Sequence, residues 1–502
     1  MSNHLFDAIR AAASGDAPFI RVNGGRTWTY KDALDLSGRI ASAMDTLGIR
    51  PGDRVAVQID KSSEALILYL ACLRSGAVYL PLNTAYTLAE LDYFISDAEP
   101  RLVVVSSSAR EGVSTIAEPH GAIVETLDAD GTGSLLDLAR DEQADFVDAS
   151  RTADDLAAIL YTSGTTGRSK GAMLTHGNLL SNALTLRDYW RVTADDRLIH
   201  ALPIFHTHGL FVATNVTLLA GASMFLLPKF DPDEVVSLMV QATLLMGVPT
   251  FYVRLLQSPR LDRQAVANMR LFISGSAPLL AETHVEFRKR TGLAILERYG
   301  MTETNMNTSN PYDGDRIAGT VGFPLPGVTV RVTDPATGRE VAPGETGMIE
   351  IKGPNVFKGY WRMPEKTAAE FTTDGFFISG DLGKIDGQGY VHIVGRSKDL
   401  VISGGYNIYP KEVEGEIDQL EGVAESAVIG VPHPDFGEGV TAIVVCKPDA
   451  TLDEKEILGA LQDRLARYKQ PKRIIFTEDL PRNAMGKVQK NVLRQKYADL
   501  YT

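Results

Sequence analysis

The sequence predicts an α/β protein with a large N-terminal domain of helix-covered sheets, a small β-barrel-like part, and a small, mobile α+β C-terminal domain. In the first half of the chain, apolar runs repeatedly end in a Gly or Pro turn and continue into a helix, which is typical of parallel strands covered by helices. After Gly319 this pattern gives way to short alternating strands, and after Gly395 it changes again. We place the boundary between the two domains, residues 1–396 and 397–502, in the charged stretch Arg396-Ser-Lys-Asp399.

Elements of the large domain follow from apolar spacing. Leu34, Ile40, Met44 and Leu47 recur at helical spacing, and Gly48 ends that helix. Next come a strand at 54–59 and a helix at 64–76, and further strands are expected before Gly- or Pro-containing turns at 157–161, 244–248 and 271–273.

The later segments VTVRVTD, GMIEIKG and GYVHIVG alternate between Gly/Pro turns, which is typical of a small β-barrel or an antiparallel sheet. In the C-terminal domain we expect helices at 411–420 and 453–468 and strands at 423–429, 440–446 and 473–476.

Composition excludes several classes of protein. The 502 residues are 44% hydrophobic and 23% charged, as in ordinary globular proteins. The 50 basic and 63 acidic side chains give a net charge of −13, which provides no general attraction to nucleic acid. Cys72 and Cys446 are far apart, which favours reduced thiols in a cytoplasmic protein. The uncharged stretch Gly209–Pro228 is interrupted by Asn215 and Gly221, so we expect a buried helix, turn and strand and no membrane insertion.

The strongest local motif is YTSGTTGRSKG, which begins at Tyr161. Its glycines let backbone N–H groups face an anion, and its hydroxyl groups add donors. An isolated stretch of this composition is usually a surface loop. Here an apolar strand precedes it and Lys170-Gly171 closes it, which favours polyphosphate binding. The expected phosphate-binding residues are Thr162, Ser163, Gly164, Thr165, Thr166, Gly167 and Lys170.

This loop resembles the nucleotide loop of the adenylate-forming enzymes, which include acyl-CoA synthetases, luciferases and peptide-synthetase adenylation domains. Four further motifs follow in the family's order: YGMTE at 299–303, SGD at 379–381, GRSKD at 395–399 and PRNAMGK at 481–487. The resemblance covers essentially the whole chain. It implies that ATP activates a carboxylic acid, that coenzyme A (CoA) then displaces AMP, and that Mg²⁺ is the cofactor.

The resemblance also implies roles for individual residues. Glu303 would hold Mg²⁺ with the Thr165 hydroxyl, and Lys487 would reach the α-phosphate and the attacking carboxylate. With His206 these give the expected catalytic set. The remaining implied ATP-binding residues are Ser276, Tyr299, Gly300, Met301, Thr302, Asp381 and Arg396.

A second set of implied roles concerns movement. Ser403, Gly404 and Gly405 resemble the loop that lines the pantetheine tunnel once the small domain has rotated, and Lys398 would be the hinge.

Acetylation of Lys487 by a lysine acetyltransferase, reversed by a deacetylase, would switch the enzyme off because it removes a charge. The chain departs from the family at Ser169, where proline is common, and near Ala484, where a hydroxyl residue is common.

The nature of the acid is indicated by Arg298, at a position where fatty-acyl and aryl relatives have a small residue. A guanidinium suits a second carboxylate, and a buried cation is costly without an anion, so a short dicarboxylate is expected. The alternative is that Arg298 pairs with Glu297 or another structural carboxylate.

With His206 in PIFHTHG and Ser276 in SGSAP as neighbours, Arg298 gives a set that resembles the malonyl-CoA synthetases, which implies malonate as the acid. Methylmalonate or another short acid remains open, as does a nucleotide-binding protein that uses no CoA.

Overall fold

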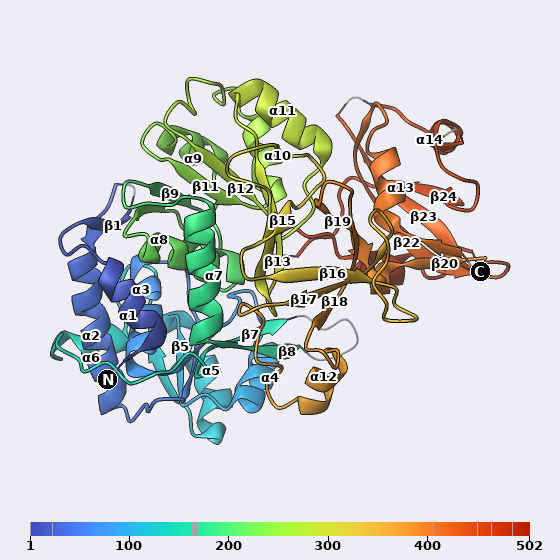
Figure 1. The fold of residues 1–502 in the computed structure, drawn as a ribbon. Helices are drawn as coiled ribbons and strands as arrows, with labels where there is room; N and C mark the ends of the chain where they lie inside the picture. Colours follow the sequence, from blue (N-terminus) through green and yellow to red (C-terminus); the bar gives the residue numbers. More distant parts are fainter. Residues whose placement is uncertain are drawn as a thin grey trace.

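The computed structural model describes residues 2–22, 24–162, 169–404, 406–448, 450–462, 464–483 and 485–501. A large domain carries a four-stranded sheet on one side, and a small C-terminal domain lies beside that sheet (Figure 1). The expected α/β architecture with two domains of unequal size is confirmed.

A six-stranded sheet in the large domain positions the phosphate loop. Its order is β6-β5-β3-β4-β7-β8; all neighbours are parallel except β7 and β8. The strands are β3 (Arg54–Gln58), β4 (Val78–Pro81), β5 (Leu102–Val105), β6 (Ile123–Thr126), β7 (Leu156–Thr162) and β8 (Lys170–Thr175). The chain enters the loop from β7 and leaves it through β8.

A nine-stranded sheet positions the acid site. Its order is β15-β14-β13-β12-β11-β9-β10-β1-β2, with parallel pairing from β13 through to β1. The strands are β1 (Pro18–Arg21), β2 (Thr27–Thr29), β9 (Arg197–His200), β10 (Ser223–Leu226), β11 (Leu244–Gly247), β12 (Leu271–Ser274), β13 (Leu296–Met301), β14 (Asn305–Ser309) and β15 (Phe323–Pro324). The carboxyl ends of the parallel strands therefore share one edge of the sheet.

Helices cover both sheets. Thr29 and Asp32 form a capping box at the start of α2, and α3 ends at Gly76, whose φ of 70° is readily adopted only by glycine. The helix α3 is buried on all sides and belongs to a core shared by both sheets. The helices are α1 (His4–Ala12), α2 (Tyr30–Thr46), α3 (Ser63–Ser75), α4 (Leu88–Ala98), α5 (Arg110–Ala117), α6 (Ser134–Arg140), α7 (His176–Tyr189), α8 (Asn215–Leu219), α9 (Pro232–Leu238), α10 (Pro249–Gln257), α11 (Ala281–Thr291) and α12 (Pro364–Ala369).

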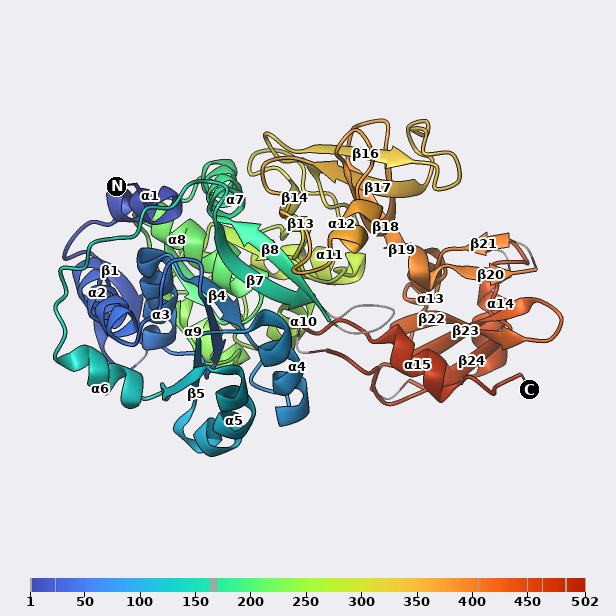
Figure 2. The same cartoon turned by 90° about the horizontal axis from the view of Figure 1, so that it is seen from below.

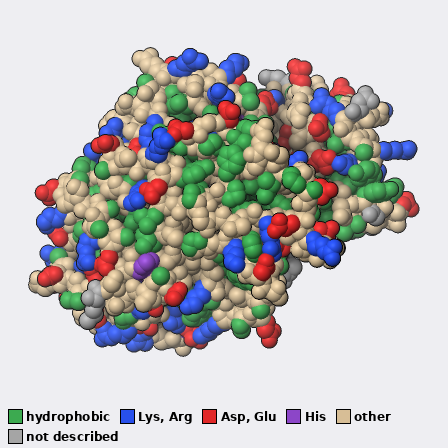
Figure 3. All heavy atoms as spheres, in the orientation of Figure 1, with side chains coloured by type: hydrophobic (Ala, Val, Ile, Leu, Met, Phe, Trp, Pro, Cys, Tyr) green, Lys and Arg blue, Asp and Glu red, His purple; other side chains and the backbone are tan. Residues whose placement is uncertain are grey.

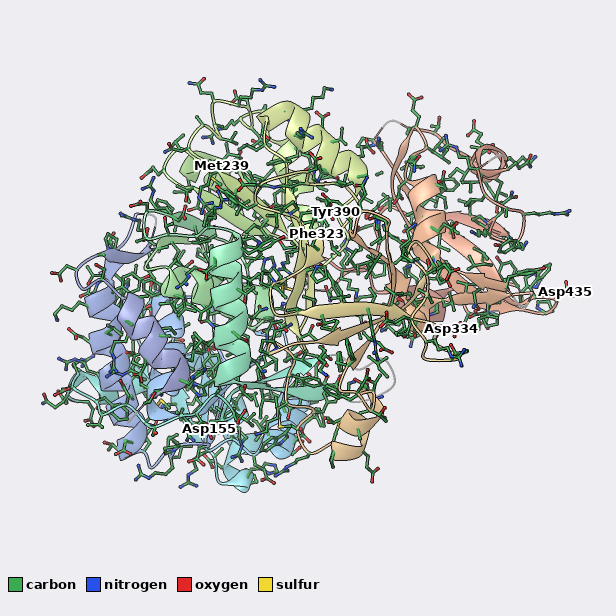
Figure 4. The ribbon with its side chains drawn as sticks, viewed as in Figure 1. Asp155, Met239, Phe323, Asp334, Tyr390 and Asp435 are labelled. Carbon is green, nitrogen blue, oxygen red and sulfur yellow. The ribbon has the colours of Figure 1, made fainter. Side chains whose placement is uncertain are left out.

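The part expected to be barrel-like is an open antiparallel sheet of β16 (Thr329–Thr333), β17 (Gly347–Lys352), β18 (Phe377–Ile385) and β19 (Val391–Arg396). Within the described ranges β19 pairs only with β18, so of the two expectations, a barrel or an antiparallel sheet, the antiparallel sheet is confirmed; an alternating pattern determines the strands but not closure. The rings of Phe323 and Tyr390, labelled in Figure 4, lie 4.2 Å apart between this sheet and β15.

The small domain has a five-stranded sheet with its own cores. Its elements are β20 (Val401–Ser403), β21 (Tyr406–Ile408), α13 (Pro410–Ile417), β22 (Val423–His433), β23 (Gly437–Cys446), α14 (Glu454–Leu461), β24 (Arg473–Phe476) and α15 (Lys490–Lys496). The helix expected at 453–468 ends at Leu461, because the chain turns there to bring β24 beside β23.

The uncharged stretch 209–228 forms most of a π-helical turn η3 (His208–Thr214), then α8 and β10, as a buried helix, turn and strand. Among the described residues, no helix is both long enough and apolar enough to span a bilayer. On the face drawn in Figure 3, Lys and Arg side chains are interspersed with Asp and Glu, so its charge is mixed.

Candidate functional site

The predicted acid-binding residues come together at the carboxyl ends of the parallel strands. His206 follows β9, Ser276 follows β12, and Arg298 lies in β13. Open α/β sheets bind ligands at this edge, because the loops that leave neighbouring strands meet there.

The Arg298 side chain is buried without a counter-ion. The residue is 3% exposed, and Nε, Nη1 and Nη2 have no hydrogen-bond partner among the described residues. Glu297 faces elsewhere: its Oε1 lies 3.8 Å from Nδ1 of His284 and accepts from the Gly319 N–H. Burial lowers the pKa of Arg298 to about 9, and the guanidinium still carries its charge at neutral pH. Since an unpaired buried cation is costly, the geometry favours an anionic ligand over the structural alternative.

Histidines surround this cation. Burial and the charge of Arg298 lower the pKa of His206 to about 4, which leaves that imidazole neutral at pH 7. The sequence interpretation missed His208, which is 1% exposed, with Nδ1 3.2 Å from the Ser276 hydroxyl. Nε2 of His208 and Oγ of Ser274 lack partners in the described part of the chain. The motif FHTH contains both histidines, but only the fold shows that the second faces Ser276.

Gly275 makes room for the guanidinium. A Cβ atom at this position would lie 2.5 Å from Cζ of Arg298, well inside van der Waals contact. We expect Gly275→Ala to displace the guanidinium by about 1 Å and lower kcat/KM for the dicarboxylate by ~10²-fold. Steady-state kinetics against Gly415→Ala, where a Cβ meets open space, measure the effect. Unchanged kinetics in Gly275→Ala would show that Arg298 tolerates the shift.

Three of the predicted ATP-binding residues, Tyr299, Asp381 and Arg396, also meet. Asp381, in β18, is 3% exposed; the Tyr299 hydroxyl donates to its Oδ2 at 2.5 Å and Nε of Arg396 lies 2.6 Å from Oδ1. At Gly300 a Cβ would lie 2.1 Å from the Asn305 carbonyl oxygen, so only glycine permits the tight β13–β14 hairpin. Met301 ends β13, and Thr302 and Glu303 lie in the turn of that hairpin.

Glu303 and Lys170 are predicted to lie on the phosphate side of the nucleotide. Glu303 is 7% exposed, burial raises the pKa of its carboxyl group, and the Tyr360 hydroxyl lies 3.0 Å from its Oε1. Lys170 pairs with Glu370 at 3.1 Å. Thr162 ends β7, whereas the predicted positions Ser163, Gly164, Thr165, Thr166 and Gly167 lie outside the described residues.

A single buried carboxylate is compatible with Mg²⁺ that takes its other ligands from phosphate and water. The described residues contain no group of three or more acidic, His or Cys side chains placed to hold a metal ion. Of the two predicted metal ligands, the structure describes Glu303, and its buried carboxylate fits the expected ion.

The small domain inserts its last loop into the large domain. Met485 is 5% exposed within the core of the large domain, and Gly486, with φ of 74°, faces the side chain of Thr250 at the start of α10. In Figure 2 the chain before α15 reaches from the small domain towards α10. Burial and the charge of Arg396 lower the pKa of Lys487 to about 8. The charges of Arg396 and Asp381 both act on this ammonium, so Lys487 lies near these two predicted ATP-binding residues.

The predicted CoA loop is not at this site. Ser403 and Gly404 belong to the β20–β21 hairpin, where Tyr406 is 57% exposed, and Gly405 lies outside the described residues. Figure 2 shows this hairpin on the side of the small domain away from the large one. Lys398 lies in the short turn η4 (Ser397–Asp399) between β19 and β20.

Comparison with models of protein families shows the family to which this chain belongs. The model of the AMP-binding enzymes matches residues 8–361, and that of the AMP-binding enzyme C-terminal domain matches residues 412–487. The chain belongs to the AMP-binding enzyme family.

Three relatives are similar to this AMP-binding enzyme over nearly their whole length. ATP-bound MatB from Rhodopseudomonas palustris is 64% identical over 100% of both chains, with a TM-score of 0.98. A feruloyl-CoA synthase from Amycolatopsis is 38% identical over 97% of both sequences. A malonate–CoA ligase from Arabidopsis thaliana is 35% identical over 98% of this chain and 90% of its own.

The two MatB structures differ in how closely their conformations match that of this AMP-binding enzyme. The apo form of MatB has the same 64% identity but a TM-score of 0.87 against 0.98 for the ATP-bound form. Since the sequences are equally similar, conformation accounts for the difference. The conformation described here, with Met485 inside the large domain, is therefore closer to the ATP-bound form of that relative than to its apo form.

Proposed function

We propose that this AMP-binding enzyme is a malonate–CoA ligase that converts malonate, ATP and CoA into malonyl-CoA, AMP and pyrophosphate through malonyl-AMP. The unpartnered guanidinium of Arg298 carries the proposal, because it provides three nitrogen atoms for a second carboxylate in an otherwise neutral pocket. The likeness to MatB and to the Arabidopsis malonate–CoA ligase supports the same substrate.

The feruloyl-CoA synthase has the higher identity of the two named ligases, 38% against 35%. Ferulate would place an aromatic ring against Arg298 and leave the guanidinium without an anion, at the cost of an unpaired buried charge. The observed pocket chemistry therefore favours the dicarboxylate over the aryl acid.

In the first half-reaction, Arg298 binds the distal carboxylate of malonate. One methylene separates the two carboxylates, so this contact also fixes the proximal, reacting carboxylate. Neutral His206, Ser276 and His208 offer hydrogen bonds without adding charge. The Lys487 ammonium, beside Asp381 and Arg396, stabilises negative charge that develops at the α-phosphate as the carboxylate attacks.

Glu303 would hold Mg²⁺, with Thr165 as the second proposed ligand. Bound there, the ion would offset the charge of the leaving pyrophosphate. We further propose that acetylation of Lys487 by a lysine acetyltransferase stops the first half-reaction, since it removes the ammonium charge.

In the second half-reaction, the CoA thiol attacks the acyl carbon and AMP leaves. In the present arrangement Lys487 lies near Arg396 and Asp381, and the hairpin that contains Ser403 and Gly404 lies on the side of the small domain away from the large one. We propose that the small domain turns about Lys398, withdraws Lys487 and brings this loop to the site.

Lys398→Pro tests the hinge. Proline restricts φ to roughly −65°, so the variant should favour one orientation of the small domain. If this is the present orientation, malonyl-AMP formation should persist while thioester formation falls by ~10-fold or more. Both half-reactions are measured separately by quenched flow. Equal small effects on the two would place the pivot elsewhere.

The overall proposal is tested with purified protein, malonate, ATP and CoA. We expect malonate-dependent pyrophosphate release without CoA, followed by CoA-dependent AMP release. Methylmalonate and butyrate are the comparison acids. Greater efficiency with methylmalonate would identify that acid as the substrate, and absence of AMP release on CoA addition would indicate a protein that adenylates without using CoA.

A further inference from the structure

A chain of polar contacts joins the two charged residues of the phosphate side. Tyr360 is 2% exposed, and its hydroxyl oxygen lies 3.0 Å from Oε1 of Glu303 and 2.6 Å from Oε2 of Glu370. The other carboxylate oxygen of Glu370 lies 3.1 Å from Nζ of Lys170. Tyr360 and Glu370, which we call the bridge, therefore connect Glu303 to Lys170.

The backbone holds the bridge against both of these residues. The segment 358–361 runs along β8: Lys358 N–H donates to the Met173 carbonyl at 2.9 Å, and Trp361 N–H donates to that of Gly171 at 2.7 Å. Just before it, Phe357 N–H donates to the Glu303 carbonyl at 2.8 Å. The segment 357–361 is therefore hydrogen-bonded both to the backbone of Glu303 and to β8, the strand that begins with Lys170.

Glu370 competes with phosphate for Lys170. The lysine ammonium lies 4.0 Å from the centroid of the Tyr360 ring, so it sits between an aromatic face and a carboxylate. Lys366 provides Glu370 with a second cation at 2.9 Å, so Glu370 keeps a partner when Lys170 leaves. An entering triphosphate would draw Lys170 away from Glu370, and departing pyrophosphate would return it.

We propose that Tyr360 and Glu370 are positioning residues with opposite effects on nucleotide binding. Tyr360 orients the Glu303 carboxylate for the metal–triphosphate. Glu370 holds Lys170 while phosphate is absent and takes it back as pyrophosphate leaves. This inference rests on the proposed nucleotide site but is independent of which acid is activated.

Isothermal titration calorimetry of the full chain with ATP, pyrophosphate and AMP, each with Mg²⁺, tests the bridge. Tyr360→Phe removes the hydroxyl but keeps the ring, and it should weaken ATP binding by ~10-fold or more, the worth of one hydrogen bond to a charged group. Glu370→Gln should tighten ATP and pyrophosphate binding by about 3- to 10-fold, because it removes the competing charge. AMP, which lacks the β- and γ-phosphates, should bind all variants alike.

Tyr390→Phe is the matched control, since its hydroxyl donates to the Asp315 carbonyl and not to a member of the bridge, and it should leave every affinity unchanged. If both bridge variants shift ATP affinity in the same direction, or AMP binding falls with ATP binding, the residues are merely structural and the proposal is overturned. Unchanged ATP affinity in Tyr360→Phe also overturns it. Failure of wild-type protein to bind ATP would refute the nucleotide site and the bridge together, whereas ATP binding without malonate turnover would refute only the substrate.

Discussion

Lys487→Ala is expected to lower the rate of malonyl-AMP formation by ~10²–10³-fold and to leave thioester formation from supplied malonyl-AMP close to wild type. The reason is that the ammonium lies near Asp381 and Arg396 in the orientation described here, and in the proposed mechanism its charge is needed only while phosphorus is attacked. Pyrophosphate release in a single turnover and thioester formation from synthetic malonyl-AMP measure the two steps.

Lys496→Ala, in the same C-terminal segment, is the control and should change neither step. Lys490, the other lysine near this motif, is a poor control because it pairs with buried Glu414 inside the small domain. Equal losses of rate in both half-reactions of Lys487→Ala would contradict the proposed role of Lys487 in adenylation alone. A fully acetylated Lys487 in fully active protein would refute the proposed off-switch.

The pH dependence of the first half-reaction follows from the same ammonium. Burial and Arg396 lower the pKa of Lys487 to about 8, so the free enzyme loses this positive charge as the pH rises through that value. We expect kcat/KM for adenylation to fall above pH 8, which gives its pH profile an alkaline limb. Thioester formation from supplied malonyl-AMP should show no such fall. The same alkaline limb in Lys487→Ala would assign it to another group.

Arg298→Gly is expected to shift specificity from malonate to short monocarboxylates. Loss of the guanidinium leaves the distal carboxylate unpaired in a buried pocket, which should cost ~2–5 kcal/mol, or roughly 30- to several-thousand-fold in kcat/KM for malonate. Butyrate never used the charge and gains the vacated space, so it should lose little or improve. The measurement is kcat/KM for both acids in both proteins.

The matched control is Gly275→Ala, which keeps the charge but displaces it, and which should reduce malonate activity without creating space for butyrate. A parallel fall of both acids in Arg298→Gly would make Arg298 structural. Retained malonate activity would place the distal carboxylate elsewhere, and the dicarboxylate proposal would then depend only on likeness to relatives.

The local elements were predictable because their signals are short-range. Apolar spacing and Gly48 indicated the helix observed as α2, and the turn residues indicated β11 and β12 within a residue or two. Whether β16 to β19 close into a barrel depends on pairing between distant strands, about which an alternating pattern carries no information. The end of α14 at Leu461 was missed for a similar reason, since the docking of β24 on β23 decides it.

The sequence by itself, through its motifs and their resemblance to the adenylate-forming enzymes, predicted the chemistry: a phosphate loop, one metal-binding carboxylate, a mobile lysine and an arginine that suits a second carboxylate. Motifs carry these predictions because charge and hydrogen-bonding capacity belong to the side chain. Only the tertiary structure decided which groups are paired. Among the described residues, Arg298 has no hydrogen-bond partner and Glu297 faces His284. His208 contacts the Ser276 hydroxyl, and Tyr360 lies between Glu303 and Glu370. Partners and burial arise from segments that are distant in the chain, and in a buried site they determine whether a charge is satisfied or available to bind a substrate.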